Sequence, residues 1–234
     1  MEKITNSKMN FVSNTPPAIY INENVVPIET CVLMKVGSHG DESFKEIIER
    51  KLREQEKCGF MLWGYSGNLM DAFMTRNHLK SKWKNGKKPV ILMIETKSPF
   101  RNSPIKSTVF SLDKRYWHKL PENAFTTGCD KAIICKGLKE VNFQLNLVSY
   151  KVSVGPSKGR ILNDYMKHRT DKACAEFFDP PEYTKADFVT VNWIAEIIPP
   201  FAVYLKDRAP AQRTLFNKIV DKTEFGLLSP NPIC

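Results

Sequence analysis

The stretch VNFQLNLVSYKVSV, residues 141–154, alternates apolar and polar side chains as a half-buried antiparallel strand does. From Val141 to Leu147 the odd-numbered residues are apolar and the even-numbered residues are amides. After Ser149 the apolar phase passes to the even-numbered residues, so we expect a bend or a change of face there. A strand of this kind is typical of an antiparallel sheet, and it fits poorly with a doubly wound parallel fold.

The rest of the chain carries shorter apolar runs and several helical patterns. Strands are expected at 28–36, 60–63, 89–96, 108–112, 132–135 and 188–198, and helices at 43–57, 69–83, 161–178 and 211–220. Ser43 and Glu46 form a capping box for the 43–57 helix, and Gly59 provides its C-terminal stop. The elements follow no regular βαβ order. This predicts an α+β fold with two to four helices and a mixed, largely antiparallel sheet, for which a barrel-like form is one alternative.

Two of these helices carry further expectations. The 69–83 helix is expected to turn Leu69, Met70, Phe73 and Met74 inward. The charged residues of the 43–57 helix, where Glu and Lys or Arg are interleaved, are expected to form an ordinary solvated face.

Three regions are expected along the chain: an N-terminal arm over 1–27, a core domain over 28–178 and a C-terminal extension over 179–234. No apolar run reaches the roughly 18 residues of a transmembrane helix, and the first residues do not resemble a signal peptide. The six cysteines have irregular spacing and no CxxC motif. They indicate reduced thiols in a cytoplasmic protein.

The net charge of +10 comes from one stretch of the chain. Residues 76–119 contain twelve Lys or Arg and two Asp or Glu, whereas the sequence on either side sums to zero. Aromatic residues are interleaved with these cations, at Trp83, Phe100, Phe110, Tyr116 and Trp117. The 76–119 block is therefore either a solvated face or a surface that contacts phosphates and stacks bases.

Several common chemistries have no matching motif. The four histidines lack an HxH or HExxH partner, so no metal site is expected. Gly64-Tyr65-Ser66-Gly67 is one residue shorter than the elbow that presents a hydrolase serine. Neither a GxGxxG nor a GxxxxGK[ST] motif is present. We therefore expect no cofactor and name no catalytic residue.

Four short segments at the ends of expected strands combine glycines, hydroxyls, cations and aromatic rings. Their candidate ligand-binding residues are Lys35 and His39; Trp63, Tyr65 and Ser66; Thr96, Lys97, Ser98 and Arg101; and Ser157, Lys158 and Arg160. Aromatic rings can stack on a base, and cations or backbone N–H groups at glycine turns can hold a phosphate. Each segment also has a purely structural interpretation as a connector, a core contact or a polar loop.

Six segments follow one another in the order VLMKVGSHGDES (32–43), LWGYSG (62–67), LMIETKS (92–98), GCDKAIIC (128–135), VSVGPSKGR (152–160) and DKAC (171–174). This succession, over roughly residues 28–178, resembles a family of uncharacterised bacterial and phage proteins. In that family the WGYxG segment tends to continue into Cys-His-Pro. This chain has residues 68–72, NLMDA, at that place, so no role of that Cys or His carries over. A phage setting would imply a role against a host defence or host nucleic-acid system.

Three functions are considered. The favoured one is a cytoplasmic, non-enzymatic binding protein with a pocket for a phosphate-bearing, nucleotide-derived small molecule. The first alternative is a nucleic-acid-binding protein that uses the 76–119 block. The second is an enzyme acting on nucleotides or nucleic acid, with His39 or His78 as the base. In such an enzyme Lys158 or Arg160 would stabilise phosphate charge. No membrane partner is expected, and a homo-oligomer stays an open alternative.

Overall fold

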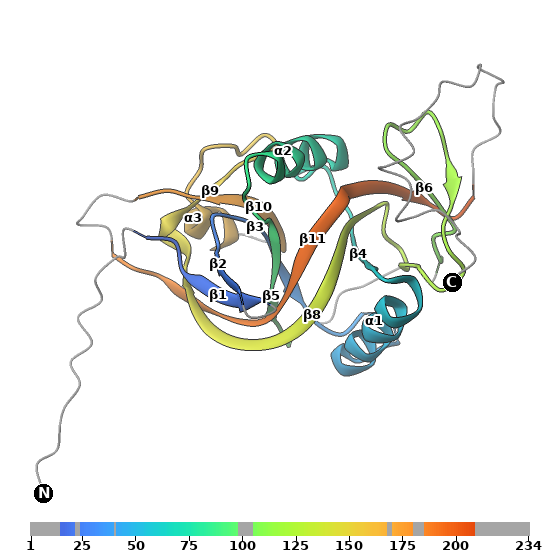
Figure 1. The fold of residues 1–234 in the computed structure, drawn as a ribbon, viewed down its shortest axis with the longest axis horizontal. Helices are drawn as coiled ribbons and strands as arrows, with labels where there is room; N and C mark the ends of the chain where they lie inside the picture. The colour runs from blue at the N-terminus through green and yellow to red at the C-terminus, as the bar shows by residue number, and fades with distance from the viewer. Residues whose placement is uncertain are drawn as a thin grey trace, which may run out of the picture.

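The computed structural model describes residues 15–21, 24–39, 41–97, 105–167, 170–179 and 185–208. The main sheet contains β3 (Thr30–Val36), β4 (Met61–Tyr65), β5 (Val90–Glu95), β6 (Val109–Ser111), β7 (His118–Lys119), β8 (Lys131–Asn146), β9 (Tyr150–Val152), β10 (Lys172–Phe177) and β11 (Phe188–Lys206). A separate antiparallel pair is formed by β1 (Ala18–Ile21) and β2 (Asn24–Pro27). The helices are α1 (Phe44–Cys58), α2 (Ala72–Lys84) and α3 (Leu162–Lys167), with a 3₁₀ turn at Leu147–Ser149 (Figure 1).

The main sheet has the strand order β4-β8-β11-β5-β3-β10-β9, and β6 and β7 branch from β11. Among the described strands β3 and β5 form the one parallel pair, and the other pairs are antiparallel. The prediction of an α+β fold with a mixed, largely antiparallel sheet and two to four helices is confirmed. The sheet does not close into a barrel, since no pairing within the described ranges joins β4 to β9 or β10.

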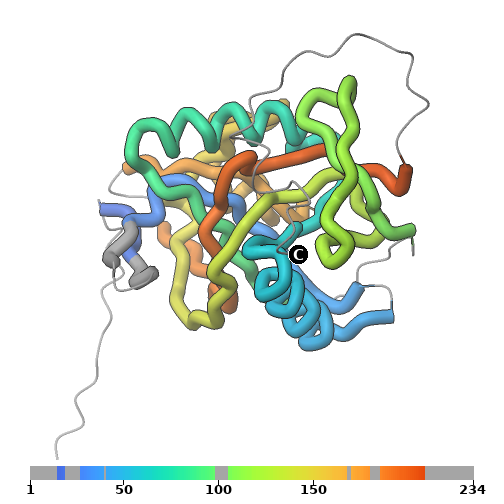
Figure 2. The backbone as a smooth tube through the Cα atoms, turned by 45° about the vertical axis from the view of Figure 1, so that its right-hand side comes forward, coloured from blue at the N-terminus to red at the C-terminus, as the bar shows by residue number. Residues whose placement is uncertain are grey.

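The sheet nevertheless curls around one apolar cluster. This cluster contains Val32 and Met34 of β3, Cys174 of β10, and Met61 and Trp63 of β4. Because β4 stands at one end of the strand order and β10 near the other, the sheet must bend until these strands face each other. The long strands β8 and β11 carry much of this bend, and α1 and α2 lie well apart in both views (Figures 1 and 2). Both helices add buried residues to the cluster.

The start of α1 confirms the predicted capping box. The Ser43 hydroxyl accepts a hydrogen bond from the Glu46 backbone N–H at 3.3 Å, and the Glu46 carboxylate accepts one from the Ser43 N–H at 2.7 Å. Gly59 ends the helix with a positive φ of 75°, which glycine adopts without strain. The local sequence therefore determines both ends of the helix.

The strands at 132–135 and 141–154, expected to be separate, are joined in the structure up to residue 146. One continuous strand, β8, runs through the intervening glycine and pairs with β11 along most of its length. Gly137 has a positive φ of 68° and lies where the β8–β11 register shifts, which is the geometry of a bulge. The 3₁₀ turn at 147–149 then separates β8 from β9, close to the change of face expected at Ser149.

The helix predicted over 161–178 is wrong beyond Lys167. Residues 172–177 form β10, between β3 and β9. Ala173, Cys174 and Ala175 are small enough to be buried on both faces of the sheet. Pairing with two strands outweighs the weak helix preference of this segment.

The buried face of α2 also differs from the prediction. Met70 is buried, but Leu69, Phe73 and Met74 are 47%, 49% and 47% exposed. The Tyr204 hydroxyl of β11 donates to the carboxylate of Asp71, the residue that caps the helix, at 2.7 Å. The residues of α2 that are buried are instead Ala72, Thr75, Arg76 and Leu79.

Residues 188–206, within the expected C-terminal extension, belong to the sheet. Strand β11 lies between β8 and β5, so the boundary expected at 178 does not separate a core from an extension. The strand continues through Pro199-Pro200, beyond the end expected at residue 198, with a register shift between Ile197 and Ala202. The helix expected at 211–220 lies outside the described residues, as do residues 1–14 of the expected arm.

Candidate functional site

A cavity of about 250 Å³ lies where β4 faces β3 and β10. Its lining comes from the end of β3 and the next turn (Met34, Lys35, Val36, Gly37, His39), from α1 (Phe44, Ile47, Arg50, Lys51), from the end of β4 (Trp63, Gly64, Tyr65, Ser66), from Thr126, Thr127, Gly128 and Cys129, and from Asp171 and Lys172. We call it the α1 cavity. The curl of the sheet brings these five segments together.

Five of the predicted site residues line the α1 cavity: Lys35, His39, Trp63, Tyr65 and Ser66. The predicted site residues of the other two segments do not line this cavity. Thr96, Lys97, Ser157, Lys158 and Arg160 are not part of the lining, and Ser98 and Arg101 lie outside the described residues.

The 155–160 loop packs elsewhere. It is closed by its own backbone hydrogen bonds, including one from the Gly159 N–H to the Val152 carbonyl at 2.7 Å. A Cβ atom on Gly155 would lie 2.1 Å from the carbonyl oxygen of Leu69. The glycine therefore permits close packing against the segment before α2, and the loop is not a clamp on the α1 cavity.

Lys35 lines the cavity, but its ammonium group is turned to the other face of β3. Its neighbours Met34 and Val36 belong to the central cluster, and side chains alternate along a strand. The Lys35 Nζ donates to the backbone carbonyl of Met166, in α3, at 3.0 Å. The Lys35 ammonium group therefore points away from the cavity in which the phosphate contact was predicted.

The cationic groups of the cavity come from residues that the sequence analysis did not select. Lys172 pairs with Met34 across β10 and β3, which places its side chain on the inner face. Its Nζ lies 2.6 Å from an Asp171 carboxylate oxygen. Lys51 and Arg50 come from α1. The sequence offered no local signal for Arg50 or Lys172, because both acquire their surroundings from distant segments.

Lys51 and Glu54 form a buried ion pair, against the expectation of a solvated face. The Lys51 Nζ lies 2.6 Å from a Glu54 oxygen and donates to the Phe125 carbonyl at 3.0 Å. The other Glu54 oxygen accepts from the Leu62 N–H of β4 at 2.8 Å. Burial lowers the pKa of Lys51 and raises the pKa of Glu54, and their mutual attraction opposes both changes. The spacing of Ile47, Lys51 and Glu54 on one helical face was a signal for this pair.

Arg50 is held from two directions. Its Nε and Nη2 atoms lie 2.7 and 2.8 Å from the two carboxylate oxygens of Glu42. The guanidinium carbon lies 5.0 Å from the centre of the Phe125 ring, a cation–π contact. The charges of Glu42 and Arg50 both act on the nearby His39. Burial lowers the pKa of the His39 imidazole, with Glu42 opposing this change and Arg50 adding to it.

The aromatic wall of the cavity consists of Phe44, Trp63 and Tyr65. Trp63 and Tyr65 are buried in the central cluster, and Phe44 packs against that cluster. Burial raises the pKa of the Tyr65 hydroxyl well above its usual value, so this group stays protonated. The predicted stacking role of Trp63 and Tyr65 stays a prediction, and their core-packing role is present in the structure.

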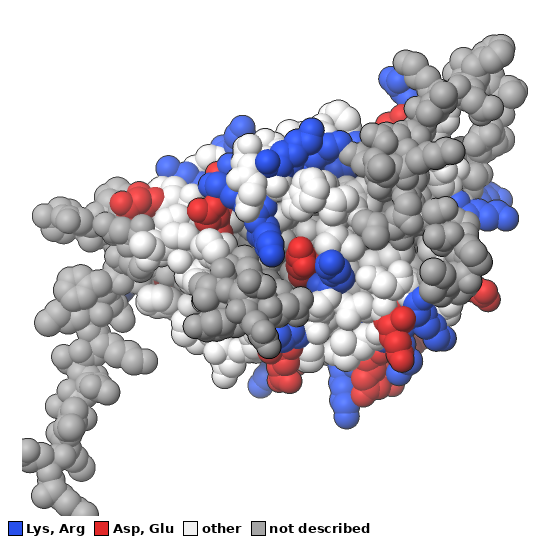
Figure 3. Space-filling view, viewed as in Figure 1, with Lys and Arg blue, Asp and Glu red and all other residues white. Residues whose placement is uncertain are grey.

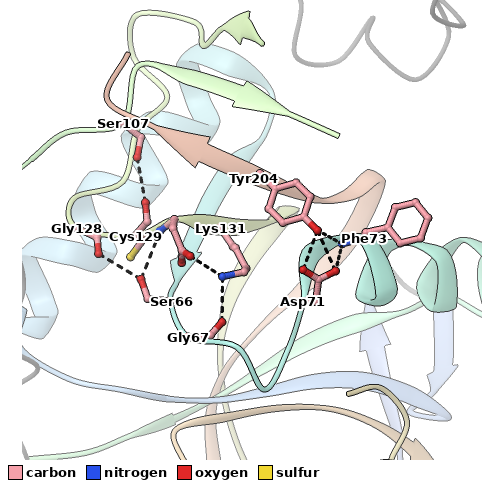
Figure 4. Close-up of polar contacts among 10 residues, drawn as sticks. Ser66, Gly67, Asp71, Phe73, Ser107, Gly128, Cys129, Lys131 and Tyr204 are labelled. Atoms are coloured by element: carbon pink, nitrogen blue, oxygen red, sulfur yellow. Dashed lines mark hydrogen bonds and ion pairs between the residues drawn. The ribbon is translucent and has the colours of Figure 1, made fainter. Parts of the chain in front are cut away.

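Ser66 fastens the 128–131 segment beside β4 (Figure 4). Its hydroxyl donates to the Gly128 carbonyl at 3.3 Å and accepts from the Asp130 N–H at 3.4 Å. Lys131 adds hydrogen bonds to the Gly67 carbonyl at 3.0 Å and to Asp130 at 2.6 Å. Ser66 is thus a residue that shapes the cavity wall.

Gly64 and Cys129 meet at this wall. A Cβ atom on Gly64 would lie 2.8 Å from the Cys129 Sγ, so only glycine lets the 126–129 segment pack against β4. Burial raises the pKa of the Cys129 thiol to about 11, although Lys51 and Lys172 nearby oppose this change. A thiol with such a pKa is protonated at neutral pH and is a poor nucleophile.

Comparisons of the chain with protein-family models, curated proteins and solved structures gave no match. The resemblance inferred from the sequence therefore stays a hypothesis. Within the described ranges no group of three or more metal-ligating side chains occurs, and no described helix is long and apolar enough to span a membrane.

The 76–119 block does not form one uniform cationic surface. Several of its cations have intramolecular contacts: Arg76 with the Leu112 carbonyl, Lys82 with Glu176, Lys87 with Glu29, Lys106 with the Phe125 ring and Lys114 with the Tyr204 ring. Figure 3 shows Lys and Arg side chains gathered over α2 on one face of the molecule. Within the described part of the block, the exposed cations are Lys84, Lys88, Lys97, Lys106, Lys114, Arg115 and Lys119, which belong to several of its segments.

Of the residues named for an enzymatic function, His39 lies apart from Lys158 and Arg160, whereas His78 is close enough to Lys158 for that charge to affect its pKa. His39 lines the α1 cavity, whereas Lys158 and Arg160 do not. His78 is on α2, and its pKa is lowered by burial, with Glu176 opposing this change and Lys82 and Lys158 adding to it. His39 therefore has no predicted phosphate-stabilising cation beside it.

Proposed function

We propose that this protein binds a small, phosphate-bearing ligand with a planar ring, of the mononucleotide type, in the α1 cavity. One observation carries the proposal. The cavity has aromatic side chains, including Trp63 and Phe44, together with the cationic groups of Arg50, Lys51 and Lys172. A wall of this composition can pack against a ring and attract an anion.

The size of the cavity limits the ligand. Small-molecule pockets usually measure about 300–1,000 Å³. The α1 cavity, at about 250 Å³, is close to the lower end of that range. A mononucleotide is therefore a better candidate than a dinucleotide, most of which would stay outside.

The cationic groups of the cavity are held in ion pairs. Each of the three cationic side chains has a carboxylate partner: Glu42 for Arg50, Glu54 for Lys51 and Asp171 for Lys172. These pairs hold the cationic groups in place before a ligand arrives, which reduces the entropy that binding has to offset. The arrangement supports recognition, and we assign it a binding function.

We also propose that the protein resides in a reducing compartment such as the cytoplasm. The five cysteines within the described residues, Cys31, Cys58, Cys129, Cys135 and Cys174, are free thiols. Buried free thiols are typical of proteins that fold where disulfides are kept reduced.

Thermal unfolding with a ligand panel tests the proposal. The panel contains the four ribonucleoside 5′-monophosphates, their deoxy forms, the matching nucleosides and inorganic phosphate. A monophosphate present at about 100 times its Kd should stabilise the fold by about 2.7 kcal/mol. For a chain of this size that corresponds to an increase in Tm of about 5–10 °C. If no nucleotide in the panel raises the Tm at millimolar concentration, the proposal is wrong.

A second candidate function, binding of single-stranded nucleic acid, has one observation in its favour. The α2 surface exposes Phe73 and Trp83, which are 49% and 47% exposed, and the exposed Lys84 directly follows Trp83. Aromatic rings beside cations can stack bases while the cations contact phosphates. This function would use the exposed surface of α2, whose residues do not line the α1 cavity.

A further inference from the structure

Arg50 differs from the other cations of the α1 cavity in how its donors are used. A guanidinium group has five N–H donors, one on Nε and two on each Nη. Glu42 engages Nε and Nη2, and the Arg50 side chain is 16% exposed. The remaining nitrogen, Nη1, is shielded from solvent and has no hydrogen-bond acceptor among the described residues.

The other two cations do not show this feature. The Lys51 ammonium makes two hydrogen bonds, to Glu54 and to the Phe125 carbonyl. The Lys172 ammonium is hydrogen-bonded to Asp171. Neither nitrogen is both buried and without an acceptor, so within the described lining Arg50 alone presents a buried cationic nitrogen that lacks an acceptor.

A buried, charged donor without an acceptor lowers stability, because its hydration is lost and nothing replaces it. We propose that an anionic oxygen of the ligand accepts hydrogen bonds from Arg50 Nη1 and thereby supplies this acceptor. The inference rests on the proposed function, because it assigns the phosphate end of the same ligand. It makes Arg50 the residue that distinguishes a nucleotide from its nucleoside.

The surroundings of Arg50 suit this role. Glu42 binds the guanidinium through two parallel hydrogen bonds, and the Phe125 ring lies over it, so its orientation is fixed. Glu42 is therefore a positioning residue. His39 lines the cavity nearby with a pKa that burial lowers, so its neutral imidazole adds no second charge at neutral pH.

The geometry also places the ring of the ligand. Arg50 and His39 belong to α1 and to the turn before it, whereas Trp63 and Tyr65 belong to β4 on another wall. A ligand with its anionic group at Arg50 would extend its ring toward β4. Phosphate and ring would then contact separate groups of residues, so their contributions to binding can be measured separately.

Isothermal titration calorimetry with three probes tests the inference: the ribonucleoside 5′-monophosphates, the matching nucleosides and inorganic phosphate. Arg50→Gln should weaken binding of the monophosphate by about tenfold or more, since a charge-assisted contact is lost, and should leave nucleoside binding unchanged. Arg50→Lys keeps the charge but lacks the Nη1 donors, and it should give an intermediate loss. Arg53→Gln, an exposed change on the same helix, is the matched control and should bind like the wild type.

The outcomes separate this inference from the proposed function. If the wild type prefers the monophosphate and Arg50→Gln keeps that preference, the Arg50 contact is refuted while the binding function stands. If the wild type binds inorganic phosphate through Arg50 but binds no nucleotide, the anion contact stands and the mononucleotide proposal fails. If the wild type binds neither, both are overturned. Should Arg50→Gln not fold by circular dichroism, Arg50→Lys decides with the same readout.

Discussion

The α1 cavity and the surface formed by α2 with the 155–160 loop both contain glycines, aromatic residues and cations. In the cavity, five segments converge, and carboxylates hold the largely buried cationic side chains in place before any ligand binds. On the α2 surface, rings and cations such as Phe73 and Lys84 are exposed, and the 155–160 loop packs on a neighbouring backbone. The same residue types therefore line a cavity in one region and form an exposed surface in the other. The burial of the side chains distinguishes the two regions.

The largest expected effect concerns the buried ion pair of the cavity. Lys51→Ala would leave Glu54 buried without its partner and should reduce the free energy of unfolding by about 3–5 kcal/mol. The matched change on the α2 side, Lys82→Ala, removes a partly exposed partner of Glu176 and should cost about 1 kcal/mol or less. Urea unfolding measures both. Equal losses for the two variants would contradict the contrast between the regions.

A change at the cavity wall should have the next largest effect. Gly64→Ala places a methyl group 2.8 Å from Cys129 Sγ and 2.9 Å from the Thr126 Cγ2, and overpacking of this kind costs about 1–3 kcal/mol. Adding Thr126→Ser removes one of the close atoms and should recover part of the loss. Thermal unfolding of the single and double variants gives the comparison. A Gly64→Ala protein with wild-type stability would mean that the wall is looser than described.

Ligand affinity should respond to the cavity and not to the loop. Trp63→Phe reduces the ring surface, and a loss of about 0.5–1.5 kcal/mol would weaken mononucleotide binding about two- to tenfold. Lys158→Gln lies outside the cavity lining and should leave the Kd unchanged. Calorimetry with the same monophosphate measures both variants. The reverse result, a loss only for Lys158→Gln, would move the binding site to the 155–160 loop.

Stability should fall as the solution becomes acidic. Burial lowers the pKa values of His39, His78 and His118 in the folded protein. Below the unfolded pKa of about 6.5 the unfolded chain therefore binds more protons, and the free energy of unfolding decreases with decreasing pH. His39→Gln removes the contribution from the cavity and should flatten this dependence between about pH 7 and pH 5. Unfolding curves over that range that coincide for wild type and variant would contradict the role of burial at His39.

The smallest expected effect is at the exposed cations. Lys84→Gln combined with Lys88→Gln removes two charges from exposed positions and should change neither stability nor mononucleotide affinity measurably. Fluorescence anisotropy with a labelled single-stranded oligonucleotide at low salt gives the second readout. Tight, salt-sensitive binding that this double change weakens would favour the nucleic-acid function over the cavity.

The sequence predicted those parts of the fold that depend on local signals. The Ser43 and Glu46 capping box determines the start of α1, and the alternation after Val141 identifies an antiparallel strand. The prediction from sequence failed at β10, because small residues such as Ala173 allow both helix and strand. Pairing with the neighbouring strands determines which of the two forms. The prediction also failed at residue 178, because the place of β11 in the sheet depends on pairing with distant segments.

The candidate site shows the same limit. Trp63 and His39 were selected from glycine-containing strand ends, and both line the cavity. Lys35 was selected for its charge, but strand alternation turns its ammonium group toward α3. Arg50 and Lys172 could not be selected, since their partners come from other parts of the fold. A linear segment indicates which groups are present, and the three-dimensional structure determines where they point.

The most direct test is a crystal structure of the protein with the monophosphate that binds most tightly in the calorimetric panel. We predict density for that molecule in the α1 cavity, with a phosphate oxygen about 2.9 Å from Arg50 Nη1 and the ring beside Trp63. An empty cavity, with the nucleotide bound on α2 or at the 155–160 loop, would contradict the account.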